Sequence, residues 1–294
     1  MDHVCVVYNA RSGALLGPDR LAGLFERRGV TAELRAFDPD TLAADVRELL
    51  AQGPGALIVA GGDGTVRAVA EIMIGQEVPL GILPGGTMNV LARDLGLPTD
   101  LDDAVDALLT APVARIDVAT VNGQVFLCSS MLAMMPHLGR LREHARGGGG
   151  PGPLRLLGRA LRVLRRYPRM RLTFVVDGQE HEARTRAAVV SCNPLAAGPA
   201  PIPGRDRLDA GRLAVYVTRD RTRWDLAVVA ARLFDGTWQR DPRIRRYDGT
   251  VVQVRSPFGY MSVMSDGEIA QLSLPLRYEI RPRALAVLAP KASA

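Results

Sequence analysis

Apolar residues in the first third of the chain form short continuous runs, which alternate with stretches that have helical spacing. A short run of adjacent apolar residues indicates a strand buried on both faces. The expected strands are His3–Asn9, Ala32–Phe37, Ala56–Ala60 and Pro79–Leu83. The expected helices between them are Asp19–Arg28, Thr41–Gln52 and Val66–Ile74, and a short helix follows Asn89. Alternating strands and helices of this kind predict a doubly wound, mainly parallel α/β domain.

The pattern changes after about residue 112, where polar and apolar residues alternate and hairpin signals appear. Asn122-Gly123 and Asp177-Gly178 each lie between two strand-like segments and are typical hairpin turns. Further expected strands are Arg212–Thr218, Tyr247–Ser256, Phe258–Ser265 and Leu276–Pro282. The second half is therefore predicted to be an antiparallel β domain.

Length and composition allow two domains with large cores, since the 294 residues are 47% hydrophobic. No apolar run approaches the ~20 residues of a membrane span, so an integral membrane protein is not expected. The start of the chain lacks a basic region and is interpreted as a strand rather than a signal peptide. Three separated cysteines suit a reducing, cytoplasmic location. A net charge of +6 favours acidic partners such as nucleotides or phospholipid surfaces.

A basic segment at 154–166 combines arginines with leucines at helical spacing. Such a helix could lie on an anionic membrane surface with its leucines inward. It could equally pack on the β domain with a solvated arginine face. Aromatic residues are scarce there, so nucleic acid is not an expected partner.

A glycine-rich turn follows the strand Ala56–Ala60. Glycines allow the backbone to approach a ligand closely, and N–H groups at a helix start can bind phosphate. Asp63 would repel bare phosphate, but it fits a site where Mg²⁺ lies between them. In such a site Thr65 could cap the following helix or bond a phosphate oxygen. The alternative is a plain turn, with an Asx-turn aspartate and Thr65 as the N-cap. The turn consists of Gly61, Gly62, Asp63, Gly64 and Thr65.

Two more turns of this kind are expected at the same edge of the sheet. Three such turns at one edge favour a ligand-binding site over three ordinary turns. One follows the first strand and contains Asn9, Ser12 and Gly13. The other follows the strand Pro79–Leu83 and contains Gly86, Thr87 and Asn89. Neither glycine turn is a Walker loop or a dinucleotide fingerprint.

Together these segments resemble the diacylglycerol kinase catalytic-domain family, which includes bacterial lipid kinases and the sphingosine and ceramide kinases. The resemblance is carried by 61–71, with Gly-Gly-Asp-Gly-Thr, and by 84–98, with Pro-Gly-Gly-Thr-Met-Asn. The opening segment 6–13 and the closing segment 265–290 extend it over nearly the whole chain. Gly-Gly-Asp-Gly-Thr alone is shared with NAD kinases.

The resemblance implies a nucleotide-binding domain at 1–116, joined by the C-terminal segment 279–294, and a lipid-substrate β-sandwich domain at 117–278. It places the active site in the cleft between them, with ATP and Mg²⁺ at the three turns and Asp63 at the metal. Asp266 and Glu268 match the family's acidic motif, in which the glutamate accepts the proton of the substrate hydroxyl. A positioned carboxylate suits that chemistry. Asp266-Gly267 also fits a simple hairpin turn.

Two departures from the family pattern are visible. Ala210 stands where many bacterial members have an aspartate for a structural Mg²⁺, leaving Asp209 or Asp206 as a doubtful substitute. Cys128 and Met134-Met135 replace the family's usual residues in a stretch that could line the lipid pocket. Substrate identity therefore does not transfer.

The resulting hypothesis is a cytoplasmic lipid kinase, peripheral on the membrane, that phosphorylates diacylglycerol or a similar lipid. The rivals are an NAD kinase-like phosphotransferase and a non-catalytic lipid-binding protein that retains the fold. The sequence leaves the oligomeric state open, with a dimer among the alternatives.

Overall fold

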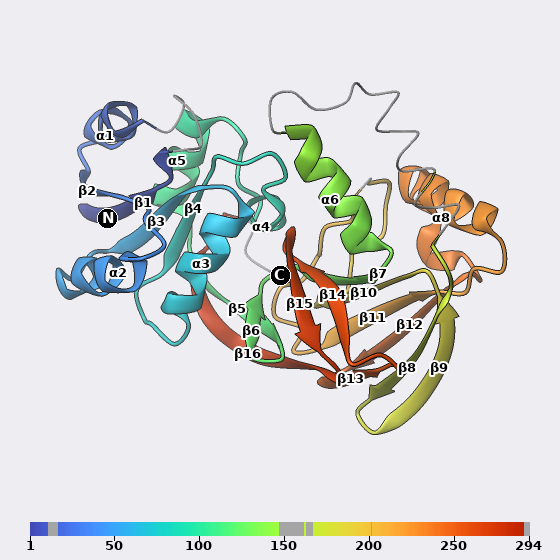
Figure 1. Ribbon diagram of the computed structural model, residues 1–294. Helices are drawn as coiled ribbons and strands as arrows, with labels where there is room; N and C mark the ends of the chain where they lie inside the picture. Colours follow the sequence, from blue (N-terminus) through green and yellow to red (C-terminus); the bar gives the residue numbers. More distant parts are fainter. Residues whose placement is uncertain (11–16, 147–161, 163–166, 201, 291–294) are drawn as a thin grey trace. The chain divides into compact units, whose positions relative to one another are not determined.

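The computed structural model describes residues 1–10, 17–146, 162, 167–200 and 202–290 (Figure 1). Ser12, Gly13 and nearly all of the predicted basic helix 154–166 lie outside the described residues. The chain divides into two compact units. Unit 1 comprises Met1–Val118, Arg207–Asp209 and the chain from Arg281 onward, and unit 2 comprises Ala119–Asp206 and Ala210–Ile280.

Unit 1 is built on a parallel sheet with the strand order β2-β1-β3-β4. Its strands are β1 (His3–Tyr8), β2 (Thr31–Ala36), β3 (Ala56–Gly61) and β4 (Leu80–Pro84). The long last strand β16 (Leu276–Leu288) joins the sheet beside β4, where Val287 lies opposite Leu80. Every residue of β3 and β4 is buried, as the continuous apolar runs predicted.

Helices cover both faces of this sheet, with α2 beside α3 and α1 beside α5 (Figure 1). They are α1 (Pro18–Glu26), α2 (Leu42–Ala51), α3 (Asp63–Met73), α4 (Val90–Asp94) and α5 (Leu101–Thr110). α1 starts with a proline, which has no N–H to satisfy in the first turn. Asp100 caps α5 by accepting from the N–H groups of Asp102 and Asp103. The predicted doubly wound α/β domain is confirmed.

Unit 2 is an antiparallel β-sandwich. One sheet contains the start of β16, followed in order by β13 (Val251–Arg255), β8 (Met170–Val176) and β9 (Gln179–Thr185). The other has the order β12-β11-β10-β7-β14-β15. Its strands are β12 (Ile244–Gly249), β11 (Leu213–Thr218), β10 (Ala187–Cys192), β7 (Ser129–Ala133), β14 (Tyr260–Ser265) and β15 (Glu268–Ser273). β5 (Val113–Val121) pairs with β16 and with β6 (Gln124–Phe126).

The core of unit 2 lies between the two sheets. Phe174 of β8 and Tyr278 of β16 come from one sheet, and Val190 of β10 and Val215 of β11 from the other, all fully buried in one cluster. The predicted β domain is therefore confirmed as a sandwich, with side chains of both inner faces packed together.

Both predicted hairpin turns are present, because Asn122-Gly123 and Asp177-Gly178 have positive φ angles at both positions. The single predicted strand Tyr247–Ser256 is wrong. The chain changes sheet at Thr250, between β12 and β13, where the Asp177 carboxylate accepts the N–H groups of Thr250 and Val251.

Unit 2 also contains helices that the sequence reading did not predict. They are α6 (Met135–Arg146), α8 (Arg223–Asp235) and the short η3 (Trp238–Arg240). Thr222 and Asp225 form a capping box at the start of α8, and Gly236 ends it in the left-handed conformation. None of the helices among the described residues has the length and apolar character needed to span a membrane.

Candidate functional site

Three turns gather at the carboxyl edge of the unit 1 sheet. Because β1, β3 and β4 are parallel neighbours, the residues that follow them share one edge. Asn9 donates its N–H to the carbonyl of Ala60 at 3.0 Å, and Gly85 donates its N–H to the carbonyl of Gly61 at 2.9 Å. The structure thus brings Asn9, the turn 61–65 and the turn 86–89 together, as predicted.

The two glycine turns touch through backbone atoms. A Cβ built on Gly86 would lie 2.7 Å from Cα of Gly62 and 2.9 Å from Oδ1 of Asn89. A Cβ on Gly61 would lie 2.9 Å from Cβ of Thr65. Gly86 is therefore needed for close approach of the two turns, and Gly61 makes room for the Thr65 side chain of its own turn.

Helix α3 starts at Asp63, three residues before the predicted start at Val66, with Gly62 as its N-cap. The suggestion that Thr65 caps the helix is wrong, because Thr65 lies within the first turn. Its buried side-chain oxygen accepts from the Asn9 amide at 3.1 Å. The first N–H groups of a helix have no intrahelical acceptor, so this end of α3 suits an anion.

Asp63 links the two glycine turns. Its Oδ1 accepts the N–H of Val90 at 2.8 Å, at the first residue of α4. Burial raises the pKa of Asp63, and hydrogen bonds from backbone N–H groups, together with the positive charge of Arg93, oppose that rise. Arg93 was not recognised in the sequence. It is exposed in the last turn of α4, where its charge acts on this site.

Asn89 fixes the second turn. It adopts the left-handed conformation with φ of 44°, which asparagine tolerates better than most residues. Its Oδ1 accepts the N–H of Gly86 at 2.8 Å, and its Nδ2 donates to the carbonyl of Gly86 at 2.8 Å. Thr87, between them, is exposed. The arrangement leaves Thr87 at the surface of the turn and holds the backbone around it.

In unit 2, Asp266-Gly267 forms the hairpin turn between β14 and β15, with φ angles of 49° and 91°. Glu268 is the first residue of β15 and is exposed. The interpretation of Asp266-Gly267 as a hairpin turn is thus correct for the backbone. The same turn sets the position of Glu268, so a hairpin turn does not argue against a role for the two acidic residues.

The carboxylate of Asp266 binds the backbone of the loop 127–129. It accepts N–H groups from Leu127 at 2.6 Å, Cys128 at 2.9 Å and Ser129 at 3.0 Å. Burial raises the pKa of Asp266, while these three N–H groups and the charge of Arg205 oppose the rise. Asp266 therefore holds the turn that carries Glu268 against this loop.

Arg205 supports the same loop and was missed in the sequence. Its side chain is buried, and Nη1 donates to the carbonyls of Leu127 at 2.5 Å and Cys192 at 3.0 Å. Nη2 lies 3.3 Å from Sγ of Cys128. No local pattern marks this arginine, because its partners lie on distant segments of the chain.

The doubtful metal candidate Asp209 is partnered by arginines. Its carboxylate lies 3.2 Å from Arg207 and 3.5 Å from Arg283. Asp206, the other candidate, is exposed. Two guanidinium groups beside Asp209 favour an ion-pair role over a cation site, because a bound cation would be repelled by both.

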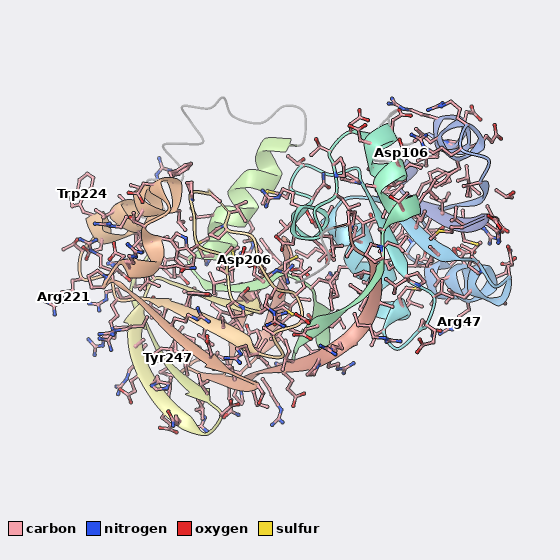
Figure 2. All side chains as sticks on the ribbon, turned by 180° about the vertical axis from the view of Figure 1, so that it is seen from behind. Arg47, Asp106, Asp206, Arg221, Trp224 and Tyr247 are labelled. Carbon is pink, nitrogen blue, oxygen red and sulfur yellow. The ribbon has the colours of Figure 1, made fainter. Side chains whose placement is uncertain are left out.

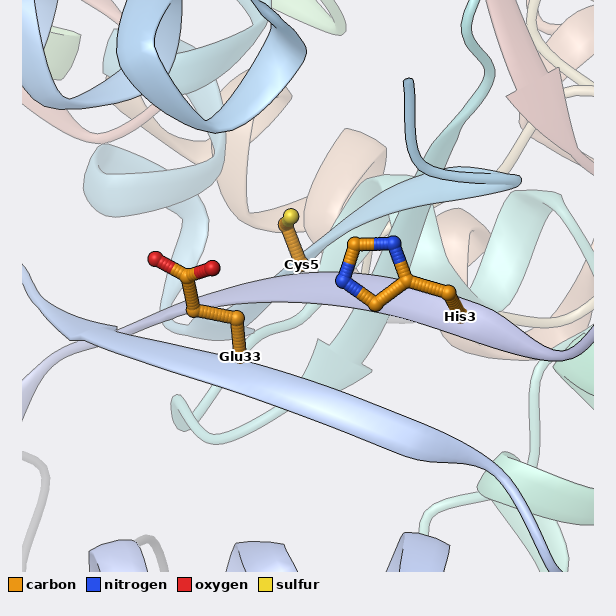
Figure 3. A group of neighbouring side chains, drawn as sticks. All are labelled: His3, Cys5 and Glu33. Atoms are coloured by element: carbon orange, nitrogen blue, oxygen red, sulfur yellow. The ribbon is translucent and has the colours of Figure 1, made fainter. Parts of the chain in front are cut away.

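The described residues contain one group of three side chains with metal-binding atoms, namely His3, Cys5 and Glu33 (Figure 3). These atoms lie within 4.8 Å of one another at the start of β1 and on β2. Burial raises the pKa of Cys5 to about 11, so the thiol form is favoured, and Sγ faces the carbonyl of Leu49. Glu33 lies 3.4 Å from Arg35. We assign this group to packing rather than to metal binding.

The sequence matches two family models that together cover most of the chain. Residues 3–121 match the diacylglycerol kinase catalytic domain. Residues 143–289, which make up half of the chain, match the YegS C-terminal NAD kinase beta sandwich-like domain.

Individual relatives are consistent with these matches. The diacylglycerol kinase of Mycobacterium tuberculosis is 28% identical over 260 residues, which cover 85% of this chain and 82% of that protein. The "Probable lipid kinase YegS-like" of Pseudomonas fluorescens is 45% identical over 84 residues, but that match spans only 28% of each protein. A diacylglycerol kinase structure from Bacillus anthracis covers 100% of this chain and 98% of that chain with a TM-score of 0.70 at 21% identity, which shows the fold.

Proposed function

The chain belongs to the diacylglycerol kinase catalytic-domain family, and from this membership we propose that it is an ATP- and Mg²⁺-dependent lipid kinase. Its substrate would be the hydroxyl of diacylglycerol or a similar lipid at the cytoplasmic membrane surface. The observation that carries the proposal is the joining of both glycine turns by Asp63 at the start of α3.

The nucleotide side of the reaction is assigned to unit 1. The backbone N–H groups at the start of α3 would bind the phosphates of ATP, at the place where the backbones of Gly62 and Gly86 meet. Asn9 would add an amide, and Arg93 would add positive charge. None of these groups of unit 1 would form a covalent bond to the nucleotide, because phosphoryl transfer requires mainly positioning and charge stabilisation.

The donor set around Asp63 fits Mg²⁺ bound together with phosphates. Mg²⁺ in kinase sites takes one or two carboxylates, phosphate oxygens and waters rather than an all-protein cage. Asp63 is a carboxylate at the anion-binding end of a helix, and it belongs to no cluster of metal-binding side chains among the described residues. When bound, the ion would neutralise charge on the transferred phosphate.

The acceptor side is assigned to unit 2. The substrate hydroxyl oxygen would attack the γ-phosphorus of ATP, its proton would pass to Glu268, and ADP would leave. Asp266 would act as a positioning residue, because its carboxylate is engaged by the amides of 127–129. The proposal requires ATP on unit 1 and the hydroxyl beside Glu268 to meet during turnover.

The test is transfer of radiolabelled phosphate from ATP to extracted lipids, with each product identified by mass. A phosphorylated single-hydroxyl lipid is the expected product. Transfer only to NAD, offered in a parallel reaction, would favour the NAD kinase-like rival. Saturable lipid binding without transfer to any acceptor would instead identify a lipid-binding protein that retains the fold.

A further inference from the structure

Helix α8 has apolar residues on two opposite faces. Its inner face carries Leu226 and Leu233, and Leu233 packs against a cluster that contains Tyr216 and Trp238. This packing fixes the helix on unit 2. The helix therefore does not need its other face for stability.

The outer face of α8 is also apolar, although it lies in solvent. Trp224 is 80% exposed, Phe234 66% and Val228 37%. Their spacing, with the exposed Ala227 and Ala231 between them, places them along one stripe of the helix. Figure 2 shows Trp224 pointing away from unit 2 at its outer margin. We call these five residues the outer face of α8. A contiguous exposed stripe with two large aromatic residues is typical of an interaction site.

Exposed arginines precede and follow this stripe in the sequence. Arg219 and Arg221 precede α8 and are exposed, and Arg221 lies at the same margin of the unit as Trp224 (Figure 2). The exposed Arg240 follows the helix. Asp225 lies 3.2 Å from Arg243, and Asp235 accepts from the neutral Thr237 and is subject to the positive charge of Arg232.

We propose that the outer face of α8 is the surface by which this protein docks on an anionic lipid bilayer. Aromatic residues settle at the boundary between lipid headgroups and acyl chains, and arginines beside them attract anionic headgroups. Charge complementarity favours this partner, because the exposed Arg219 and Arg221 immediately precede the stripe. The inference rests on the proposed lipid kinase function, and it names the surface that brings the enzyme to its substrate.

The two tryptophans of the chain provide a direct measurement. Trp224 is exposed, whereas Trp238 is buried at 2% exposure. In a Trp238→Phe variant all tryptophan emission comes from Trp224. Vesicles of phosphatidylglycerol should shift this emission to shorter wavelength, and vesicles of phosphatidylcholine should do so at least about tenfold more weakly. Unshifted emission with both vesicles would overturn the proposal.

Vesicle flotation tests the same surface without a fluorescent reporter. Trp224→Ala combined with Phe234→Ala should lower partitioning onto phosphatidylglycerol vesicles by at least about tenfold. The matched control is Phe258→Ala with Tyr260→Ala, because those side chains are 59% and 65% exposed elsewhere in unit 2. Equal partitioning of wild type and the α8 variant would contradict the proposal.

Two further readouts separate this proposal from its alternatives. If the outer face instead binds a second copy of the chain, the α8 substitutions will convert a dimer to a monomer in sedimentation, which would overturn the bilayer assignment. Vesicle binding is measured without ATP, so it can succeed even if the kinase proposal fails. If both hold, the α8 variant should phosphorylate a short-chain lipid in free solution at the wild-type rate and lose activity only on vesicles.

Discussion

Asp63 Oδ1 lies 2.8 Å from the backbone nitrogen of Val90 and accepts its N–H, which joins the first turn of α3 to the first residue of α4. One carboxylate therefore sets the spacing of two turns that are separated by the whole of α3 and β4. It also places negative charge at the end of a helix that otherwise attracts anions. This placement is unfavourable for bare phosphate and favourable for phosphate with a cation.

Asp63→Asn should lower kcat/KM for phosphate transfer by at least about 100-fold, the scale typical of a lost electrostatic contact in a transition state. The amide oxygen can still accept the Val90 N–H, so the thermal midpoint should change little. The control is Asp103→Asn, an exposed residue in the first turn of α5. Full activity in Asp63→Asn would remove Asp63 from the metal and nucleotide site.

The contact between the glycine turns gives a second prediction. Gly86→Ala places a methyl group 2.7 Å from Cα of Gly62. Because Cα is a backbone atom, this contact can be relieved only if the two turns move apart. We expect a loss of about 1–3 kcal/mol in the free energy of unfolding, by overpacking, together with a weaker affinity for ATP. Denaturant melts and nucleotide titration measure the two effects.

Gly23→Ala is the matched control for that change. Gly23 lies in α1, and a Cβ there would meet only Nη1 of Arg27 at 3.6 Å, an ordinary contact. Alanine has the higher helix propensity, so this variant should gain up to about 1 kcal/mol. Equal effects of the two substitutions would mean that the turn contact is not restrictive.

Glu268→Gln tests the proposed proton acceptor. A positioned general base contributes about 10²–10⁴ in rate, so kcat should fall by that factor. The residue is exposed at the start of β15, and its substitution should leave the thermal midpoint near that of wild type. Glu180→Gln is the control, because Glu180 is an exposed glutamate of β9 in the same unit. Unchanged kcat in Glu268→Gln would exclude it as the base.

Much of this architecture could be predicted from local sequence. Continuous apolar runs marked β1, β3 and β4 of unit 1, and Asn122-Gly123 marked a hairpin through its left-handed backbone. The helix α8 was missed although its signals are local. Thr222 and Asp225 form its capping box, and Gly236 ends it. The apolar residues on both of its faces do not give the one-sided pattern by which helices are recognised.

The support of the acidic turn could not be predicted, because it depends on contacts between distant segments. Asp266 binds the N–H of Leu127 across 139 residues of sequence, and Arg205 binds the carbonyl of Leu127 across 78. An aspartate before glycine gives the same local signal whether or not its carboxylate has such partners. The roles of Asp266 and Arg205 appear only when the sandwich brings these segments together.

Arg205 therefore gives a fourth prediction. Arg205→Lys keeps the charge, but its single nitrogen on a shorter stem cannot replace Nη1, which binds the Leu127 and Cys192 carbonyls, and Nη2, which contacts Cys128 Sγ, together. Leaving one of these buried acceptors without a donor costs about 1–3 kcal/mol, which a denaturant melt would detect. kcat should fall as well, because the loop 127–129, whose N–H groups bind the Asp266 carboxylate, would lose its hydrogen bonds to Arg205. Arg207→Lys, at an exposed position nearby, should change neither quantity.

Asp177 gives a prediction for the pH dependence of stability. Burial alone would raise its pKa, but hydrogen bonds from Val251 and Thr250 outweigh it, and the net shift is downward. A carboxyl with a lowered pKa stabilises the fold above the pKa of the unfolded chain, and this contribution disappears as the pH falls through the folded value. Asp177→Asn should therefore be less stable than wild type at pH 7, by less than about 1 kcal/mol, because Asp177 is exposed and solvent screens its charge.

That difference should begin to narrow near pH 4, the ordinary pKa of an aspartate in the unfolded chain, and should keep narrowing as the pH falls through the lower pKa of the folded protein. Denaturant melts of both proteins from pH 7 to pH 3 measure it. The exposed Asp206, replaced by Asn, is the control and should follow the wild type at each pH. A stability difference independent of pH would mean that Asp177 acts through the shape of its turn rather than through its charge. The sheet change at Thr250 would then depend on backbone geometry alone.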